Sequence, residues 1–318
     1  MPARPIFIFS RLILSLLLML PYSLPASTLA SKQSDEIANV DQLVSIHFDA
    51  SLNAAERKIT QQWLKEVTDA LLTVYGQFPQ DNFDITIKRS SSQTSPVPWG
   101  QVDRGKPANV LLVINPDLGY DELISDWTAF HELSHLLLPY RGYGNIWLSE
   151  GLATYYQNII QVRSDLLDDK EMWQKIMAGF TRGSNDQRWR HLNLTDVSDN
   201  LRETRQFMRV HWSGVLFWLT ADVALRKEGI KSLDSALKKL QDCCAERSMS
   251  AEAIVRKLDQ LTGENIFVPL FNEYRNSYSI PAYETLLADL GVKQKKSADG
   301  ITFNKNAPLA HIRQQISR

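Results

Sequence analysis

The feature that most constrains this chain is the five-residue run His131-Glu132-Leu133-Ser134-His135, set in an otherwise apolar helical pattern. On an α-helix, positions i and i+4 share one face, so both imidazoles can reach a single ion. Glu132 can then take a proton from water activated by that ion. Two histidines and a glutamate on so apolar a helix would be costly unless paired or coordinated. The run therefore predicts a zinc site with Glu132 as general base; the alternative is two ordinary core or surface histidines.

A second run is Trp147-Leu148-Ser149-Glu150-Gly151-Leu152-Ala153-Thr154-Tyr155-Tyr156, and fourteen residues separate its Glu150 from His135. Ser149 is a good N-cap for a helix, and Gly151 allows another helix to approach closely. Glu150 could supply the third ligand, which gives the two His and one Glu of a catalytic zinc site with an open position for water. The alternative is that Glu150 only complements the dipole at the start of its helix.

Together the two runs resemble the gluzincin peptidases, and most closely the aminopeptidase N and glycyl aminopeptidase families. Their third zinc ligand lies in a Trp-Leu-x-Glu-Gly-aromatic-Ala stretch, and the likeness covers roughly residues 120–310. It implies a thermolysin-like catalytic domain, one zinc ion and peptide substrates. The spacing from His135 to Glu150 is shorter than usual in those families, and their large N-terminal β domain and C-terminal PDZ domain have no counterpart here.

A third segment, residues 209–219, corresponds to the part of those families that carries a catalytic tyrosine three residues before a glycine. Here His211 stands in that place, before Gly214. A histidine can also donate a hydrogen bond to the oxyanion of a tetrahedral intermediate, and such donors are worth about 3–4 kcal/mol. We therefore predict His211 as a catalytic residue. The alternative is a packed helix residue, with the donor missing or supplied by Tyr155 or Tyr156.

Hydrophobic periodicity predicts an α+β fold that divides near residue 120. Strands are expected at 43–48, 83–87 and 110–114, with a helix from Asn53 to about Tyr75. Residues 90–108 are expected to form a loop or an irregular edge strand. Helices follow over 121–138, from near Ser149, and over 165–180, 201–228, 232–246, 250–261, 264–277 and 281–290. The expected organisation is a signal peptide (1–30), an N-terminal α+β part (31–120) and a helical zinc-binding part (121–318).

The N-terminus has the layout of a secretory signal peptide, with Arg4 and Arg11 around an apolar run and a cleavage site after Ala30. This predicts a secreted or periplasmic protein without a stable membrane span after cleavage, and the alternative is an N-terminal membrane anchor. With a net charge of -1 and no basic patch, nothing points to nucleic acid. The adjacent Cys243 and Cys244 favour two thiols on a helix over a vicinal disulfide or pairing with another chain. Nothing indicates the oligomeric state.

The sequence thus predicts a secreted zinc peptidase of unknown specificity. Residues 98–103 are the nearest candidate for a substrate-binding edge strand, where Gly100 would let a substrate backbone approach and Asp103 could meet an amine. Asp126 and Asn158 are candidates to orient the histidines. Two other readings stay open: a catalytically silent peptide- or metal-binding protein on the same scaffold, and a structural envelope protein whose aromatic clusters serve protein contacts.

Overall fold

The computed structural model describes residues 35–36, 44–186, 188–227, 229, 231–295 and 300–318. The predicted signal peptide and its cleavage site after Ala30 lie outside the described residues, so secretion and membrane anchoring stay predictions. Among the described residues, no helix is both long enough and apolar enough to cross a bilayer.

A five-stranded sheet occupies the N-terminal part. Its strands are β1 (Asp35–Glu36), β2 (Val44–Phe48), β3 (Phe83–Arg89), β4 (Trp99–Asp103) and β5 (Ala108–Ile114), in the order β1-β2-β3-β5-β4. The three central strands β2, β3 and β5 are parallel, and β1 and β4 flank them antiparallel. The predicted strands at 43–48, 83–87 and 110–114 are confirmed. Residues 90–108, for which a loop or an irregular edge strand was expected, contain the edge strand β4.

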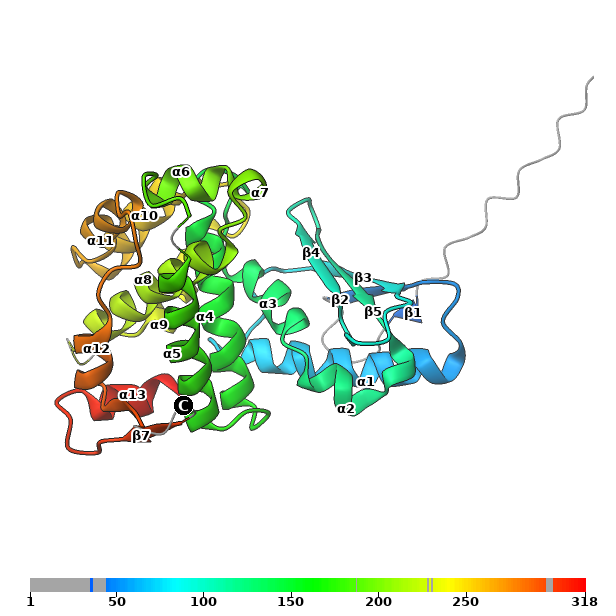
Figure 1. Cartoon of the computed structure of the whole chain (residues 1–318). Helices are drawn as coiled ribbons and strands as arrows, with labels where there is room; N and C mark the ends of the chain where they lie inside the picture. The colour runs from blue at the N-terminus through cyan, green and yellow to red at the C-terminus, as the bar shows by residue number, and fades with distance from the viewer. Residues whose placement is uncertain (1–34, 37–43, 187, 228, 230, 296–299) are drawn as a thin grey trace, which may run out of the picture. The chain divides into compact units, whose positions relative to one another are not determined.

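Helix α1 (Ala54–Leu72) runs along one face of this sheet (Figure 1). Asn53 caps it as predicted, accepting from the backbone N–H groups of Ala55 and Glu56, while the Glu56 carboxylate accepts from the Asn53 N–H in return. Alternate residues of β3 and β5 are fully buried. They join the apolar face of α1 in one core, which excludes water from this side of the sheet.

The remainder of the chain is mostly helical. Its elements are η1 (Pro116–Leu118), α2 (Tyr120–Ser125), α3 (Thr128–Ser134), η2 (His135–Leu137), α4 (Trp147–Arg163), α5 (Asp169–Asn185), α6 (Leu194–Asp199), α7 (Leu201–Thr204), α8 (Phe207–Lys227), α9 (Leu233–Cys244), α10 (Ala251–Thr262), α11 (Phe267–Arg275), α12 (Glu284–Asp289), the β6–β7 hairpin (Val292–Gln294, Ile301–Phe303) and α13 (Ala310–Ile316). Helix α3 lies between the sheet and α4 and contacts both (Figure 1).

Three predicted boundaries were wrong. The single helix expected over 121–138 breaks at Asp126, whose extended backbone and side-chain bond to the Thr128 N–H start a new helix. Helix α4 begins at Trp147, so Ser149 lies inside it and caps nothing. The helix expected over 201–228 is interrupted at Arg205, which adopts a left-handed conformation.

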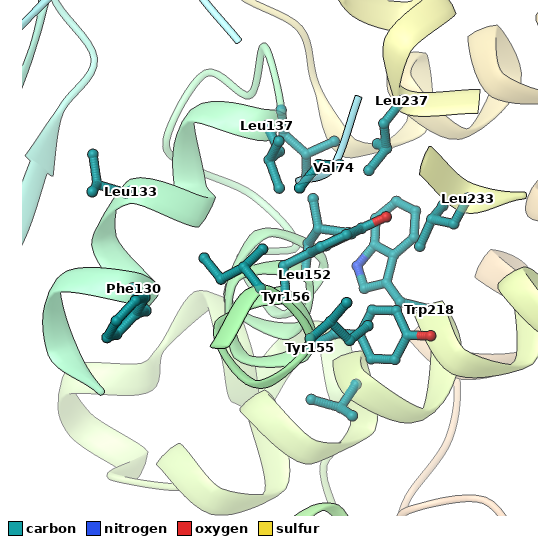
Figure 2. Close-up of a cluster of buried hydrophobic side chains, with 14 of the residues drawn as sticks. Val74, Phe130, Leu133, Leu137, Leu152, Tyr155, Tyr156, Trp218, Leu233 and Leu237 are labelled. Carbon is teal, nitrogen blue, oxygen red and sulfur yellow. The ribbon is translucent and has the colours of Figure 1, made fainter. Parts of the chain in front are cut away.

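Helices α4 and α8 cross with their backbones in contact at two glycines. A Cβ on Gly151 would lie 2.2 Å from the Gly214 Cα, and a Cβ on Gly214 would lie 2.2 Å from the Trp147 carbonyl oxygen. No side chain fits at either place. Buried side chains of α4, α8 and α9 pack together beside this crossing. Tyr155, Tyr156 and Trp218 belong to that cluster (Figure 2).

The two cysteines form a disulfide with each other, at the end of α9. The prediction of two free thiols was therefore wrong, and the alternative, a vicinal disulfide, is present. Sequence alone could not decide, because the outcome depends on the local backbone at Cys243 and Cys244.

Candidate metal centre and cleft

His131, His135 and Glu150 bring their ligand atoms together. The Oε2 atom of Glu150 lies 3.4 Å from Nε2 of His131 and 3.6 Å from Nε2 of His135, and all three ligand atoms lie within 4.8 Å of one another. Ligands at about 2.0–2.1 Å from a tetrahedral zinc ion are separated by roughly 3.4 Å. The Glu150 oxygen lies at about this separation from both imidazole nitrogens, and a small adjustment of the side chains would let all three residues bind one zinc ion.

Each of these side chains is set by its helix. His131 projects from α3, and His135 opens the 3₁₀ turn that ends before Pro139. Both imidazoles are buried, while Glu150 in the first turn of α4 keeps about a quarter of its side chain exposed. The exposed part of Glu150 opens toward a cleft of about 810 Å³, into which all three residues face.

The outer ring nitrogens of both histidines are engaged. Nδ1 of His131 lies 2.8 Å from Oε1 of Gln157, and Nδ1 of His135 lies 3.1 Å from Oγ of Ser149. Such partners orient an imidazole so that Nε2 faces the metal. Neither partner was predicted from the sequence. Gln157 could have been found, since it lies seven residues after Glu150 on the same face of one helix.

The two candidates proposed for that orienting role are used elsewhere. The carboxylate of Asp126 accepts from the backbone N–H of Thr128, and the amide of Asn158 donates to the carbonyl of Thr154. Neither side chain has a hydrogen bond to His131 or His135 in the described part of the chain.

Burial and mutual proximity set the charges at the metal centre. Burial opposes ionisation of Glu150, but the neighbouring histidines outweigh it and hold its pKa below the usual range. Burial also opposes protonation of His131, yet its hydrogen bond to Glu150 raises its pKa. Burial lowers the pKa of His135 well below its usual value.

Glu132 stands at the wall of the cleft against strand β4. A Cβ on Gly100 would lie 2.5 Å from Cγ of Glu132 and 3.0 Å from its Oε1, so only glycine leaves room for this carboxylate. Burial raises the pKa of Glu132 to about 7, and the positive charge of a bound cation would lower it again. A carboxylate with a pKa near neutrality can both accept and return a proton.

His211 approaches the same centre from α8. Its Nε2 lies 3.6 Å from Oε2 of Glu150, its ring stacks on that of His131 at 5.8 Å between centroids, and its Nδ1 lies 3.1 Å from Oγ1 of Thr154. It does not belong to the compact three-ligand group. Burial lowers the pKa of His211 to about 4, so the imidazole is neutral. It is placed to donate a hydrogen bond beside an ion held by His131, His135 and Glu150.

The alternative donors, Tyr155 and Tyr156, are directed away from the cleft. Both are fully buried in the core of Figure 2, where the Tyr155 hydroxyl donates to Asp222 and the Tyr156 hydroxyl donates to Asp234. Of the candidate donors, His211 alone lines the cleft.

The cleft is walled on one side by strand β4 and rimmed by exposed aromatic side chains. Trp99, Trp127 and Phe207 line it, and each keeps close to half or more of its surface exposed. Gly100 to Asp103 border it along the free edge of β4, where an extended chain could add to the sheet.

Comparison with known proteins agrees with this geometry. Residues 141–218 match the family model of the M61 glycyl aminopeptidase, a segment that contains Glu150 and His211. No curated protein sequence matches the chain. An aminopeptidase N family protein from Idiomarina loihiensis superposes with a TM-score of 0.62 at 15% identity, covering 86% of this chain and 52% of that one.

Two further solved structures superpose more loosely. The M1 zinc metallopeptidase from Deinococcus radiodurans has a TM-score of 0.46 at 16% identity, covering 75% of this chain and 49% of that one. Yeast LTA4 hydrolase has a TM-score of 0.49 at 16% identity, covering 81% and 41%. The chain thus spans about half the length of these proteins or less.

The α+β fold predicted from the sequence, with a small N-terminal sheet and a helical remainder, is confirmed by the match to the Idiomarina protein. The resemblance drawn from the sequence motifs is confirmed as well: the chain carries a segment of the M61 glycyl aminopeptidase type within a fold similar to that of the aminopeptidase N family.

Proposed function

We propose that this protein is a zinc-dependent peptidase that hydrolyses peptide bonds in the cleft beside β4. The observation that carries the proposal is the convergence of His131, His135 and Glu150 at zinc-ligand spacing, with the Glu132 carboxylate at the wall of the same cleft. A pure metal-storage site would need no such carboxylate.

When bound by these three residues, a zinc ion would polarise the scissile carbonyl and activate a water molecule for attack. Glu132 accepts the proton released in that attack and returns it to the leaving amine, and its burial at the wall of the cleft raises its pKa and so favours proton uptake. His211 donates from Nε2 to the developing oxyanion, while its Nδ1 is held by Thr154.

We further propose that the substrate lies extended along the free edge of β4. Gly100 leaves the edge open at the point nearest Glu132, and Trp99 and Trp127 provide apolar surface for side chains on that side of the cleft. Asp103, exposed at the end of β4, is the candidate for contact with a substrate amine. The sequence and geometry leave exopeptidase and endopeptidase action open.

The proposal is tested by incubating the zinc-loaded full chain with a mixed peptide library and identifying products by mass spectrometry. Glu132→Gln removes the general base and Glu122→Gln, on the exposed surface of α2, is the matched control. We expect cleavage by the wild type and the control, and none by Glu132→Gln. The chemical ends of the products distinguish aminopeptidase from endopeptidase.

The competing function is a catalytically silent peptide- or metal-binding protein on the same scaffold. It predicts that all three proteins bind zinc and none cleaves any peptide. A structural envelope protein would show no zinc binding by the wild type.

A further inference from the structure

Arg104 is the first residue after β4, and its guanidinium contacts the metal centre. Nη1 donates to the backbone carbonyl of His135 at 3.2 Å, and Nη2 donates to Oγ of Ser149 at 2.9 Å. The same Oγ lies 3.1 Å from Nδ1 of His135. Arg104 therefore holds His135 twice, directly at its backbone and through one hydroxyl at its ring.

The carbonyl of His135 is available to Arg104 because a proline stands four residues further along the chain. In an α-helix this oxygen would accept from the N–H of the fourth residue on, which is Pro139 and has no N–H. The remaining backbone donor, the N–H of Leu138, reaches it only at 3.4 Å. Pro139 thus leaves the carbonyl oxygen of His135 without its helical hydrogen bond, and Arg104 donates to that oxygen instead.

The hydroxyl of Ser149 can serve both neighbours at once. A serine oxygen offers two acceptor positions. If Nε2 of His135 binds a metal, its Nδ1 carries the hydrogen and donates to Oγ. Arginine has no acceptor, so Nη2 can only donate as well. Oγ of Ser149 then accepts from both, and the guanidinium fixes the position of the atom that orients the ring.

No ion pair explains the presence of Arg104. Across the residues that the structure describes, no carboxylate lies within 4.0 Å of its guanidinium, which instead stacks on the ring of Tyr140 at 5.4 Å. Burial lowers the pKa of Arg104, and the opposing influences of Glu150, Tyr140 and Glu132 do not outweigh it. A cation kept in such a place at a desolvation cost indicates a role at the centre itself.

We propose that Arg104 is a positioning residue for His135, which it ties to the end of the substrate-binding edge strand through Ser149. The proposal rests on the metal centre of the proposed function and not on its substrate. Groups that orient a metal ligand in this way typically change metal affinity 10- to 100-fold when they are removed.

The test measures zinc affinity of the full-length chain by competition with a fluorescent chelator, together with the melting temperature of the metal-free protein. The variants are Arg104→Met, Ser149→Ala and the double variant. Arg141→Met is the control, since Arg141 lines the same cleft and also stacks on a tyrosine, Tyr143 at 4.2 Å. We expect zinc affinity to fall 10- to 100-fold for Arg104→Met and to stay within about threefold of the wild type for Arg141→Met.

The double variant decides whether Arg104 acts through Ser149. Because the two residues belong to one hydrogen-bonded chain, their effects on zinc affinity should combine to less than the product of the single effects. If the two single effects on zinc affinity multiply in the double variant, Arg104 does not act through Ser149. Wild-type zinc affinity in a folded Arg104→Met protein would overturn the positioning role altogether.

Arg104→Lys covers the case in which Arg104→Met fails to fold. One ammonium can replace one of the two hydrogen bonds, so an intermediate affinity supports the proposal, and wild-type affinity contradicts it. Zinc affinity and peptide turnover are separate readouts. A wild type that binds zinc but cleaves nothing defeats the proposed peptidase and leaves this inference to be decided by the chelator data.

Discussion

Replacing Gly100 by alanine places one methyl group between the edge strand and the proposed general base. The new Cβ would lie 2.5 Å from Cγ of Glu132 and 3.0 Å from its Cδ. Ordinary carbon contacts begin near 3.5 Å. One of the two groups must therefore move by about 1 Å.

The side chain of Glu132 is the group that moves. Strand β4 is held along its length by β5, with Gly100 opposite Leu112 in register, whereas Glu132 can rotate about its own bonds toward the open cleft. The free energy of unfolding should then fall by only about 1 kcal/mol, at the low end of overpacking costs. A misplacement of 1 Å in a reacting group can lower the rate about 100-fold.

The assay compares kcat/KM on a peptide cleaved by the wild type, zinc affinity and urea unfolding. Gly105→Ala is the matched control, because Gly105 is exposed and its nearest contact would be an ordinary 3.4 Å to the carbonyl of Pro107. We expect about a 100-fold loss of kcat/KM for Gly100→Ala with unchanged zinc affinity, and no loss for Gly105→Ala. Activity within threefold of the wild type would refute the assignment of Glu132 to this wall of the cleft.

Three further predictions concern the helices that carry the centre. Gly214→Ala forces α4 and α8 apart, since the added Cβ would lie 2.2 Å from a backbone atom. We expect the free energy of unfolding, measured by chemical denaturation, to fall by about 3 kcal/mol or more, beyond the usual 1–3 kcal/mol of overpacking. Thr154→Val removes the partner of the His211 Nδ1 at 3.1 Å, so kcat should fall about 10-fold while zinc content by elemental analysis stays at that of the wild type. Zinc affinity measured across pH should decrease on acidification and begin to do so above the ordinary histidine range, because the raised pKa of His131 beside Glu150 means that zinc must displace a proton there; an affinity independent of pH between 5 and 8 would contradict this.

The metal-binding group could be predicted because it depends on spacing within helices. His131 and His135 share a face by their separation alone, and Glu150 stands at the head of the next helix. Strands β2, β3 and β5 could also be predicted, β3 from the alternation of residues 83–87 and β5 from the continuous aliphatic run at 110–114.

What could not be predicted depends on contacts between distant segments. Ser149 looked like a helix cap, and its partners, His135 and Arg104, became visible only once α3, α4 and the end of β4 were placed together. The break at Asp126 is a local competition, in which one side-chain hydrogen bond outweighs the helical pattern around it. Cys243 and Cys244 depended likewise on the local backbone at the end of α9.

The contact of α4 with α8 through Gly151 and Gly214 has a consequence for how such a site can evolve. Backbone touches backbone there, so the distance between the helices does not depend on the side chains that face the cleft. The backbone position of His211, three residues before Gly214, is consequently set by this contact and not by the side chain that it carries. Neither glycine can gain a side chain alone, so we expect descendants of this chain to keep glycine at both positions.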